Sequence, residues 1–214
     1  PVASIQGYLE TILENPNIND TMRQQFLERS YAQSQRLTSL LQDISTLNRM
    51  DDAPEITTQE HVDIANMVAN IQKETALQLQ DKHMTFVNRL PADLVICGNA
   101  SLVYSIFRNL TDNAIAYAGM GTTITLTAQY VQTNFDDHAK WHFRFSDNGV
   151  GVAPEHLQRL FERFYRVDKG RSRKMGGTGL GLAIVKNAVI LHGGTISVHN
   201  NEDGGLCFEF TLRA

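Results

Sequence analysis

The sequence has little cysteine and no long apolar run. Its two cysteines, Cys97 and Cys207, match no metal-binding spacing, so we expect both to be small core residues in a reducing compartment. No apolar stretch approaches the roughly 18 residues that cross a bilayer, and the chain does not open on a charged segment followed by an apolar one. The residues present therefore give no sign of a disulfide scaffold, a membrane span or a signal peptide.

Extremes of composition are absent as well. Hydrophobic residues make up 42% of the chain and charged residues 20%, which is typical of a folded domain and not of disordered or collagen-like sequence. There is no internal repeat and no low-complexity segment. At about 100–200 residues per domain, the 214 residues predict one large domain, or one domain with a smaller companion.

Basic residues are scarce in the first part of the chain. Residues 1–60 carry four basic and nine acidic side chains, whereas residues 61–214 carry fifteen and fourteen. Within the second part, residues 159–174 carry seven basic side chains against Glu162 and Asp168. Such a basic run is either a solvated loop or a surface for a polyanion.

Glycine is nearly missing from the first fifty residues, where apolar residues recur at helical spacing. The segment Asn15-Pro16-Asn17 interrupts the pattern, because the residue before proline is disfavoured in a helix. Asn19 or Asp20 is suited to cap a second helix that continues to about Arg49. The pattern predicts a helical hairpin. Two helices cannot enclose their own apolar faces, so we expect the hairpin to dimerise into a four-helix bundle, the alternative being that it packs on the rest of its own chain.

A polar stretch broken by Pro54, residues 51–55, marks the domain boundary. We expect a hairpin domain at 1–52, a linker at 53–60 and a second domain at 61–214. In the second domain the patterns predict helices at 61–81, 99–117 and 178–192, short strands at 84–88 and 93–97, and longer strands at 122–131, 140–146, 194–199 and 206–212. This mixed order predicts an α+β sandwich, with a mainly antiparallel sheet covered by helices on one face.

Two motifs in this domain carry amide and carboxylate groups. In NLTDN, Asn109 and Asn113 are four residues apart on one helix face and offer oxygens to a hard cation or amides to a phosphate. In DNGVG, Asp147 ends a strand and is placed to accept a hydrogen bond from an exocyclic amine, while Gly149 and Gly151 permit close approach of a ligand. Taken singly, the first is also explained by solvated or capping asparagines and the second by a plain turn.

Two further motifs lie closer to the C-terminus. FERFYR, residues 161–166, is an aromatic cluster at the start of the basic run, and it either anchors a mobile segment whose arginines face phosphate or simply packs in the core. GGTGLGL, residues 176–182, precedes an apolar helix whose N-terminal amides favour an anion. Its spacing fits neither the dinucleotide-binding nor the Walker pattern.

In their order and spacing, these four motifs resemble the N, first glycine, F and second glycine boxes of the catalytic, ATP-binding domain of sensor histidine kinases. The acidic hairpin is similar to the dimerisation and histidine-phosphotransfer domain of the same family. The resemblance implies a helical hairpin, half of a dimeric four-helix bundle, followed by an α/β sandwich of the histidine kinase/Hsp90-like ATPase type. It implies an ATP-dependent autokinase that transfers the γ-phosphate to a histidine and from there to a response regulator aspartate.

The resemblance also implies roles for single residues. Asp147 would accept from the adenine amino group, with Gly149 and Gly151 beneath the ring and Tyr117 against it. Asn109 and Asn113 would hold Mg²⁺ and orient the triphosphate, and Arg166 would contact the γ-phosphate. The phosphates would follow the backbone of the second glycine box, which comprises Gly177, Thr178, Gly179, Leu180 and Gly181. Residues 167–177 would form a mobile ATP lid.

The sequence departs from the family pattern at three places. The opening PVASIQGYLETIL is similar to the segment that comes after the family's phosphoacceptor motif, with Pro1 as the last residue of that motif, so the acceptor histidine would precede the chain. Ala116 stands where the family often has lysine, and Asn99 where aspartate is frequent and caps the following helix. The resemblance thus implies a fragment of a longer kinase that lacks its own acceptor, from the cytoplasmic portion of a membrane-anchored bacterial sensor. It implies homodimers and a response regulator receiver domain as partners, with no nucleic acid.

Other functions share this fold. ATPases of the gyrase, Hsp90 and MutL type need a glutamate as general base where this sequence has Asn109, and an amide cannot take that proton. Serine kinases of the anti-sigma type lack the preceding hairpin. A nucleotide-binding dimerisation scaffold without activity is the third alternative.

Overall fold

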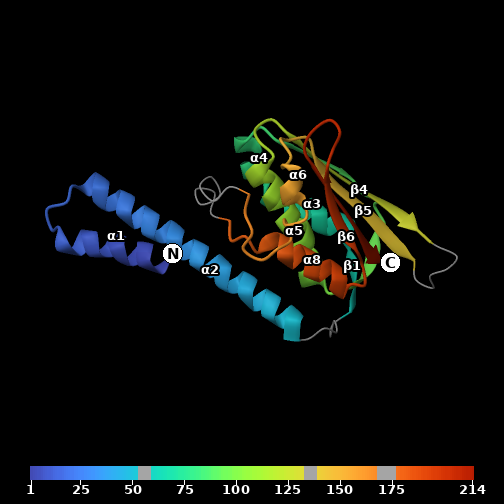
Figure 1. Cartoon of the computed structure of the whole chain (residues 1–214), viewed down its shortest axis with the longest axis horizontal. Helices are drawn as coiled ribbons and strands as arrows, with labels where there is room; N and C mark the ends of the chain where they lie inside the picture. The colour runs from blue at the N-terminus through green and yellow to red at the C-terminus, as the bar shows by residue number, and fades with distance from the viewer. Residues whose placement is uncertain (53–58, 133–138, 168–176) are drawn as a thin grey trace. The chain divides into compact units, whose positions relative to one another are not determined.

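The computed structural model describes residues 1–52, 59–132, 139–167 and 177–214 (Figure 1). The chain divides into two compact units, one built on residues 1–46 together with Gly177 and Thr178, and the other comprising residues 47–167 and 179–214. Within the described residues, no helix combines the length and the apolar character needed to cross a bilayer.

The first unit is the predicted helical hairpin. Helix α1 spans Val2–Glu14 and helix α2 spans Asp20–Asp52, whose last turns, from Leu47 on, belong to the second unit. The turn is fixed at both ends, because Asn15 Nδ2 donates to the Thr11 carbonyl at 2.8 Å and the Met22 amide donates to Asn19 Oδ1 at 2.8 Å. The stacked rings of Tyr8 and Phe26, with centroids 5.6 Å apart, join the two helices. Asn19 is thus the cap, and α2 continues three residues beyond the predicted end at Arg49.

A five-stranded sheet is the centre of the second unit. Its order is β2 (Thr85–Arg89), β4 (Thr123–Val131), β5 (Lys140–Asp147), β7 (Leu206–Arg213) and β6 (Ile196–Asn200). Among the described strands of this sheet, only the β2–β4 pair is parallel. One face carries the buried rings of Phe143, Phe145, Phe208 and Phe210, and the alternating residues, such as Arg144 and Glu209, lie on the other.

Helices cover the aromatic face (Figure 1). Helix α5 (Ala100–Tyr117) sets Phe107 against Phe143 and Phe210, with ring centroids 5.5 and 5.9 Å apart. Helix α8 (Gly181–Leu191) packs beside α5 and against β6 and β7. The remaining helices are α3 (Ile64–Glu74), α4 (Ala76–Asp81) and the short α6 (Pro154–Leu157). The predicted α+β class, a helical hairpin followed by an α/β sandwich, is confirmed.

Two expectations for this unit were wrong. Residues 61–63 belong to strand β1 (Glu60–Asp63), which pairs antiparallel with β3 (Val95–Gly98), so the helix predicted from residue 61 begins at Ile64 and is interrupted at Thr75. Strand β1 forms because its partner supplies the hydrogen bonds, although the partner is distant in sequence. Cys97 is exposed and not a core residue, whereas Cys207 is buried as expected.

Candidate nucleotide-binding site

Helix α5 presents the two asparagines of the first motif. Asn109 Nδ2 donates to the Ser105 carbonyl at 2.8 Å, which leaves Asn109 Oδ1 as an acceptor. Asn113 is one helical turn further on, and within the described chain its side-chain amide has no hydrogen-bond partner. The Asn99 side chain caps the helix by accepting from the Leu102 amide at 3.0 Å, as the sequence predicted. The helix thus offers two amide oxygens on one half-buried face.

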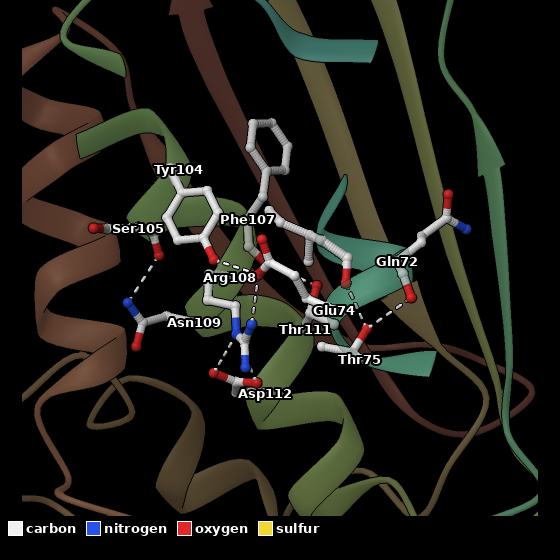
Figure 2. A network of polar contacts seen from close by, with 11 residues as sticks. Gln72, Glu74, Thr75, Tyr104, Ser105, Phe107, Arg108, Asn109, Thr111 and Asp112 are labelled. Atoms are coloured by element: carbon white, nitrogen blue, oxygen red, sulfur yellow. Dashed lines mark hydrogen bonds and ion pairs between the residues drawn. The ribbon is translucent and has the colours of Figure 1, made fainter. Parts of the chain in front are cut away.

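A polar network fixes the rotation of α5 (Figure 2). Arg108 pairs with Asp112 on its own helix and with Glu74 of α3, at 2.9 Å in each case. Tyr104 adds a hydrogen bond from its hydroxyl to Glu74 Oε2 at 2.6 Å. Arg108 and Asp112 each come one residue before an asparagine of the motif. The network therefore holds α5 against α3 with the asparagines on the neighbouring face.

Asp147 is the last residue of β5 and is nearly buried, with 8% of its surface exposed. Its Oδ1 accepts from the Gly149 amide at 2.9 Å and from the Leu206 amide at 3.4 Å. Burial raises the pKa of this carboxyl, and the two backbone donors lower it in part. Because both donors use Oδ1, Oδ2 is the oxygen that can accept a hydrogen bond from a ligand.

The loop after Asp147 fits closely against two neighbours. A Cβ at Gly149 would lie 2.2 Å from the Ala118 carbonyl oxygen, and a Cβ at Gly151 would lie 2.6 Å from Asn200 Oδ1. The first contact joins the loop to the end of α5, where Tyr117 is 37% exposed. This proximity brings the predicted adenine contact, Tyr117, to the same end of the sheet as Asp147.

The residues that support this loop belong to none of the motifs recognised in the sequence. Asn200 Oδ1 accepts from the Val152 amide at 3.0 Å and Asn200 Nδ2 donates to the Val152 carbonyl at 2.7 Å. Asn201 Nδ2 donates to the Asp147 carbonyl at 2.9 Å, and a Cβ at Gly205 would lie 2.0 Å from that same oxygen. The sequence feature that could have identified these residues is two consecutive asparagines at a strand end, followed by a glycine pair.

The second glycine box meets the first asparagine. A Cβ at Gly181, the first residue of α8, would lie 2.5 Å from Asn109 Oδ1. Leu180 is 1% exposed and fixes the start of the helix in the core. The amides of the first turn of α8 therefore lie beside the asparagine oxygen, where an anion and a cation would both be stabilised.

The aromatic motif touches the same box. The Phe164 amide donates to the Gly179 carbonyl at 2.8 Å, and both residues have positive φ, 64° and 78°. Phe161 packs edge-on against Phe208, with centroids 6.3 Å apart. Phe164, in contrast, is 60% exposed, so core packing accounts for only one of the two phenylalanines.

The remaining predicted residues lie at the edge of the described chain. Arg166 is half-buried and follows the aromatic motif. Gly177 and Thr178 follow the gap, and Thr178, which groups with the first unit, donates from Oγ1 to Asp43 Oδ2 at 2.6 Å. Most of the predicted lid, residues 168–176, lies outside the described residues. The structure thus places Gly181 against Asn109 on α5, and the loop after Asp147 against the end of α5 beside Tyr117.

The geometry agrees with comparisons to known proteins. Residues 98–214 match the family described as "Histidine kinase-, DNA gyrase B-, and HSP90-like ATPase". The chain belongs to this ATPase family. Residues 1–53 match a second family, the "His Kinase A (phospho-acceptor) domain". Together the two matches place the chain among the histidine kinases of the family and imply that it uses ATP.

A relative and two solved structures support this placement. The sensor-like histidine kinase SenX3 of Mycolicibacterium smegmatis is 30% identical over 99% of this chain, which covers 53% of the relative. The fold is similar to that of Acinetobacter baumannii histidine kinase AdeS, with a TM-score of 0.77 and 21% identity, covering 100% of this chain and 94% of that one. It is also similar to histidine kinase ThkA in complex with response regulator protein TrrA, with a TM-score of 0.74 and 17% identity, covering 100% of this chain and 57% of ThkA. The chain spans about half the length of the curated relatives it matches.

Proposed function

We propose that this chain is the ATP-dependent autokinase core of a two-component sensor. In this proposal the second unit binds ATP and delivers the γ-phosphate to a histidine outside residues 1–214, from which it passes to a response regulator aspartate. The observation that carries the proposal is that α5 lies against both the loop after Asp147 and the start of α8, in a chain whose first 53 residues match the phosphoacceptor family.

Asp147 and Tyr117 suit an adenine ring. The Oδ2 of Asp147 can accept from the exocyclic amine, and the exposed face of Tyr117 can lie against the ring. Gly149 and Gly151 leave the base of the site without side chains. Asp147 and Tyr117 therefore favour a base with a hydrogen-bond donor at this position. Adenine has its exocyclic amine there, whereas guanine has the acceptor O6.

The residues near α8 suit a triphosphate with Mg²⁺. The amide oxygens of Asn109 and Asn113 are hard donors of the kind that Mg²⁺ accepts, and two protein ligands are typical for it. When bound, the ion would neutralise charge on the transferring phosphate. The amides of the α8 N-terminus bind phosphate oxygens, and we propose Arg166 for the γ-phosphate, with Gly177 and Thr178 continuing the phosphate path.

Hydrolysis by the gyrase, Hsp90 or MutL mechanism is disfavoured by the same residues. Asn109 donates from Nδ2 to the Ser105 carbonyl and has no group that takes a proton from water. Positioning and charge neutralisation suffice for phosphoryl transfer to an imidazole, which needs no deprotonation when neutral. The site therefore favours transfer over hydrolysis.

The hairpin supplies the partners in this proposal. Its apolar side chains are exposed on both helices, including Leu13, Leu27 and Leu41, and pairing with a second copy would bury them in a four-helix bundle. A response regulator receiver domain would dock on the remaining hairpin surface. We also propose that the chain works as the cytoplasmic portion of a membrane-anchored sensor.

The experiment extends the chain before Pro1 with the histidine motif that the family resemblance places there. The extended protein is incubated with Mg²⁺ and γ-labelled ATP, and we expect label that is acid-labile and base-stable. A second extended protein with glutamine in place of the histidine is the matched control and should remain unlabelled. Nucleotide bound without label in the extended protein would contradict the kinase function and favour the scaffold alternative, and rapid phosphate release without label would favour the ATPase.

A further inference from the structure

Three metal-ligating side chains meet on the sheet face opposite the helices. His199 is on β6, and Cys207 and Glu209 are on β7. A ring nitrogen, the thiol sulfur and a carboxylate oxygen from these residues all lie within 4.8 Å of one another. None of them belongs to the nucleotide site, and in the sequence their spacing matches no metal motif because the ligands come from two strands.

Strand register holds the three together. His199 is directly opposite Cys207, and Glu209 is two residues further along β7 and therefore on the same face. The alternating residues Phe208 and Phe210 are buried in the core, so the side chains of Cys207 and Glu209 lie on the opposite face of the sheet. The side chains of His199, on the edge strand β6, and of Glu209, on β7, are half-buried and therefore within reach of solvent. The cluster is thus a feature of the sheet and not of a mobile loop.

The donor types select the ion. Imidazole, thiolate and carboxylate are the ligands of zinc, whereas Mg²⁺ and Ca²⁺ favour oxygen alone. A tetrahedral zinc site, with bonds of about 2.0–2.3 Å, sets its ligand atoms roughly 3.5 Å apart, so small side-chain rotations close this cluster around an ion. The charges of the thiolate and carboxylate would balance the two positive charges of the metal.

Arg144 completes the arrangement as a neighbour of the sulfur. Its Nε donates to Cys207 Sγ at 3.2 Å, and its Nη2 donates to Asn201 Oδ1 at 3.2 Å. Thiolate sulfur retains further lone pairs, and such outer hydrogen bonds orient metal ligands and tune their affinity. The Asn201 side chain also donates to the Asp147 carbonyl. It therefore connects the cluster to the proposed nucleotide site, although the two sites share no ligand.

We propose that His199, Cys207 and Glu209 form a three-ligand site for zinc or a similar borderline divalent metal. The fourth position is open to water or to a small ligand. The site is independent of the proposed nucleotide chemistry, which uses hard oxygen donors on α5.

Cobalt titration tests the site with the whole chain. In buffer with a non-thiol reductant and no nucleotide, Co²⁺ should produce a thiolate-to-metal charge-transfer band that saturates at one equivalent and is displaced by Zn²⁺. Cys207→Ser should abolish the band. His199→Gln and Glu209→Gln should each weaken Zn²⁺ binding by about tenfold or more, measured against a chromophoric chelator.

Two variants serve as matched controls. Cys97→Ser removes the other cysteine and His142→Gln removes a histidine from the neighbouring strand β5, and both should leave the band and the Zn²⁺ affinity unchanged. Circular dichroism checks the fold of each variant. If Cys207→Ser does not fold, the half-buried His199 and Glu209 variants decide the matter. The proposal is overturned if no band appears with one equivalent of Co²⁺, if Cys97→Ser removes it, or if the His199 and Glu209 variants bind Zn²⁺ as tightly as the original chain.

Discussion

Asp147, the residue proposed to contact adenine, is ionisable and nearly buried, which affects stability. Burial raises the pKa of its carboxyl, so the charged form that binds best is the form that the folded state holds less well. For a group whose pKa is raised by folding, the stabilising contribution is present at acid pH and is lost as the pH rises through that pKa. The fold therefore gains no stability from ionised Asp147, which agrees with its proposed role in binding a ligand.

Replacing this carboxylate should separate binding from stability. In Asp147→Asn the side-chain oxygen still accepts from Gly149 and Leu206, but an NH₂ group replaces the acceptor Oδ2 and faces the adenine amine. We expect the affinity for a non-hydrolysable ATP analogue to fall by about 10- to 100-fold, the value of a hydrogen bond to a charged group. The thermal midpoint should stay equal or rise. Calorimetric titration and thermal melts measure the two effects.

Asp203→Asn is the control for the same change of charge. Asp203 is exposed in the turn between β6 and β7, so its replacement should alter neither quantity. A loss of stability in Asp147→Asn as large as its loss of affinity would show that the residue is structural.

His192 gives the second unit a stability that depends on pH. Its Nε2 accepts from the Asn99 amide at 3.1 Å and its Nδ1 contacts the Ala188 carbonyl at 2.7 Å, so the neutral ring joins α8 to the cap of α5. Burial lowers the pKa of His192 from its ordinary value of 6.5, and the bond to Ala188 raises it in part. A pKa lowered by folding gives stability that is full above the ordinary value and is lost as the pH falls toward the folded pKa.

His192→Gln keeps an acceptor without a titrating group. We expect the unfolding free energy of the original chain to fall below pH 6.5, by up to about 1.4 kcal/mol per pH unit, and that of the variant to vary less with pH. Urea denaturation at pH 7.5 and 5.5 measures the difference. His61→Gln, which changes an exposed histidine, should behave like the original chain. Parallel pH profiles for all three proteins would disprove this role.

The residues proposed to contact the ligand could be named from the sequence, whereas the residues that support them could not. Asp147 and Asn109 were recognised because each belongs to a short motif. The supporting bonds, from Val152 to Asn200 and from Leu206 to Asp147, join residues 48 and 59 positions apart. Such contacts depend on strand register, which a local pattern does not contain.

Close packing of helices shapes the proposed site, most clearly where α8 begins beside α5. In Gly181→Ala the new Cβ would lie 2.5 Å from Asn109 Oδ1, so the amide has to move. We expect the affinity for the ATP analogue in the presence of Mg²⁺ to fall about tenfold, because an ion ligand is displaced. Affinity measured in EDTA should change much less, which separates the loss of the ion from damage to the adenine site.

Gly7→Ala is the matched control for this change. A Cβ at Gly7 meets nothing within 4 Å, and alanine in the interior of α1 should stabilise the helix by roughly 0.5–1 kcal/mol. Nucleotide affinity should be unaffected with or without Mg²⁺. Equal losses for Gly181→Ala in Mg²⁺ and in EDTA would contradict a displacement of Asn109.

Helices and strands were predicted correctly where the apolar periodicity extends over many residues. Helices α1, α2, α5 and α8 and the strands of the large sheet were predicted because apolar periodicity extends through each of them. Strand β1 was missed because its residues were assigned to the helix that follows it, and its pairing with β3 is a tertiary effect. The interruption at Thr75 was missed because its hydroxyl bonds to the Ile71 carbonyl, at 2.8 Å, in the buried interior.

The whole molecule was predicted to have two parts of different kind, and its hairpin part exposes apolar side chains. Helix α2 exposes Leu41 to 60% and Ile44 to 38%, three residues apart on one face. Surface leucines are common singly, but a repeated apolar face on a two-helix unit needs a cover. The proposed dimer provides one.

Leu41→Glu combined with Ile44→Glu should break that dimer. Glutamate forms helix well, so helicity should persist, whereas burying each apolar side chain contributes about 1.5 kcal/mol or more, so the dimer dissociation constant should rise at least about a hundredfold. Sedimentation velocity over a range of protein concentrations measures the change. Gln35→Glu combined with Gln42→Glu adds the same charge at exposed polar positions of α2 and should leave the dimer intact. Equal dissociation by both pairs would assign the effect to charge, and an original chain that stays monomeric at every concentration would refute the apolar interface.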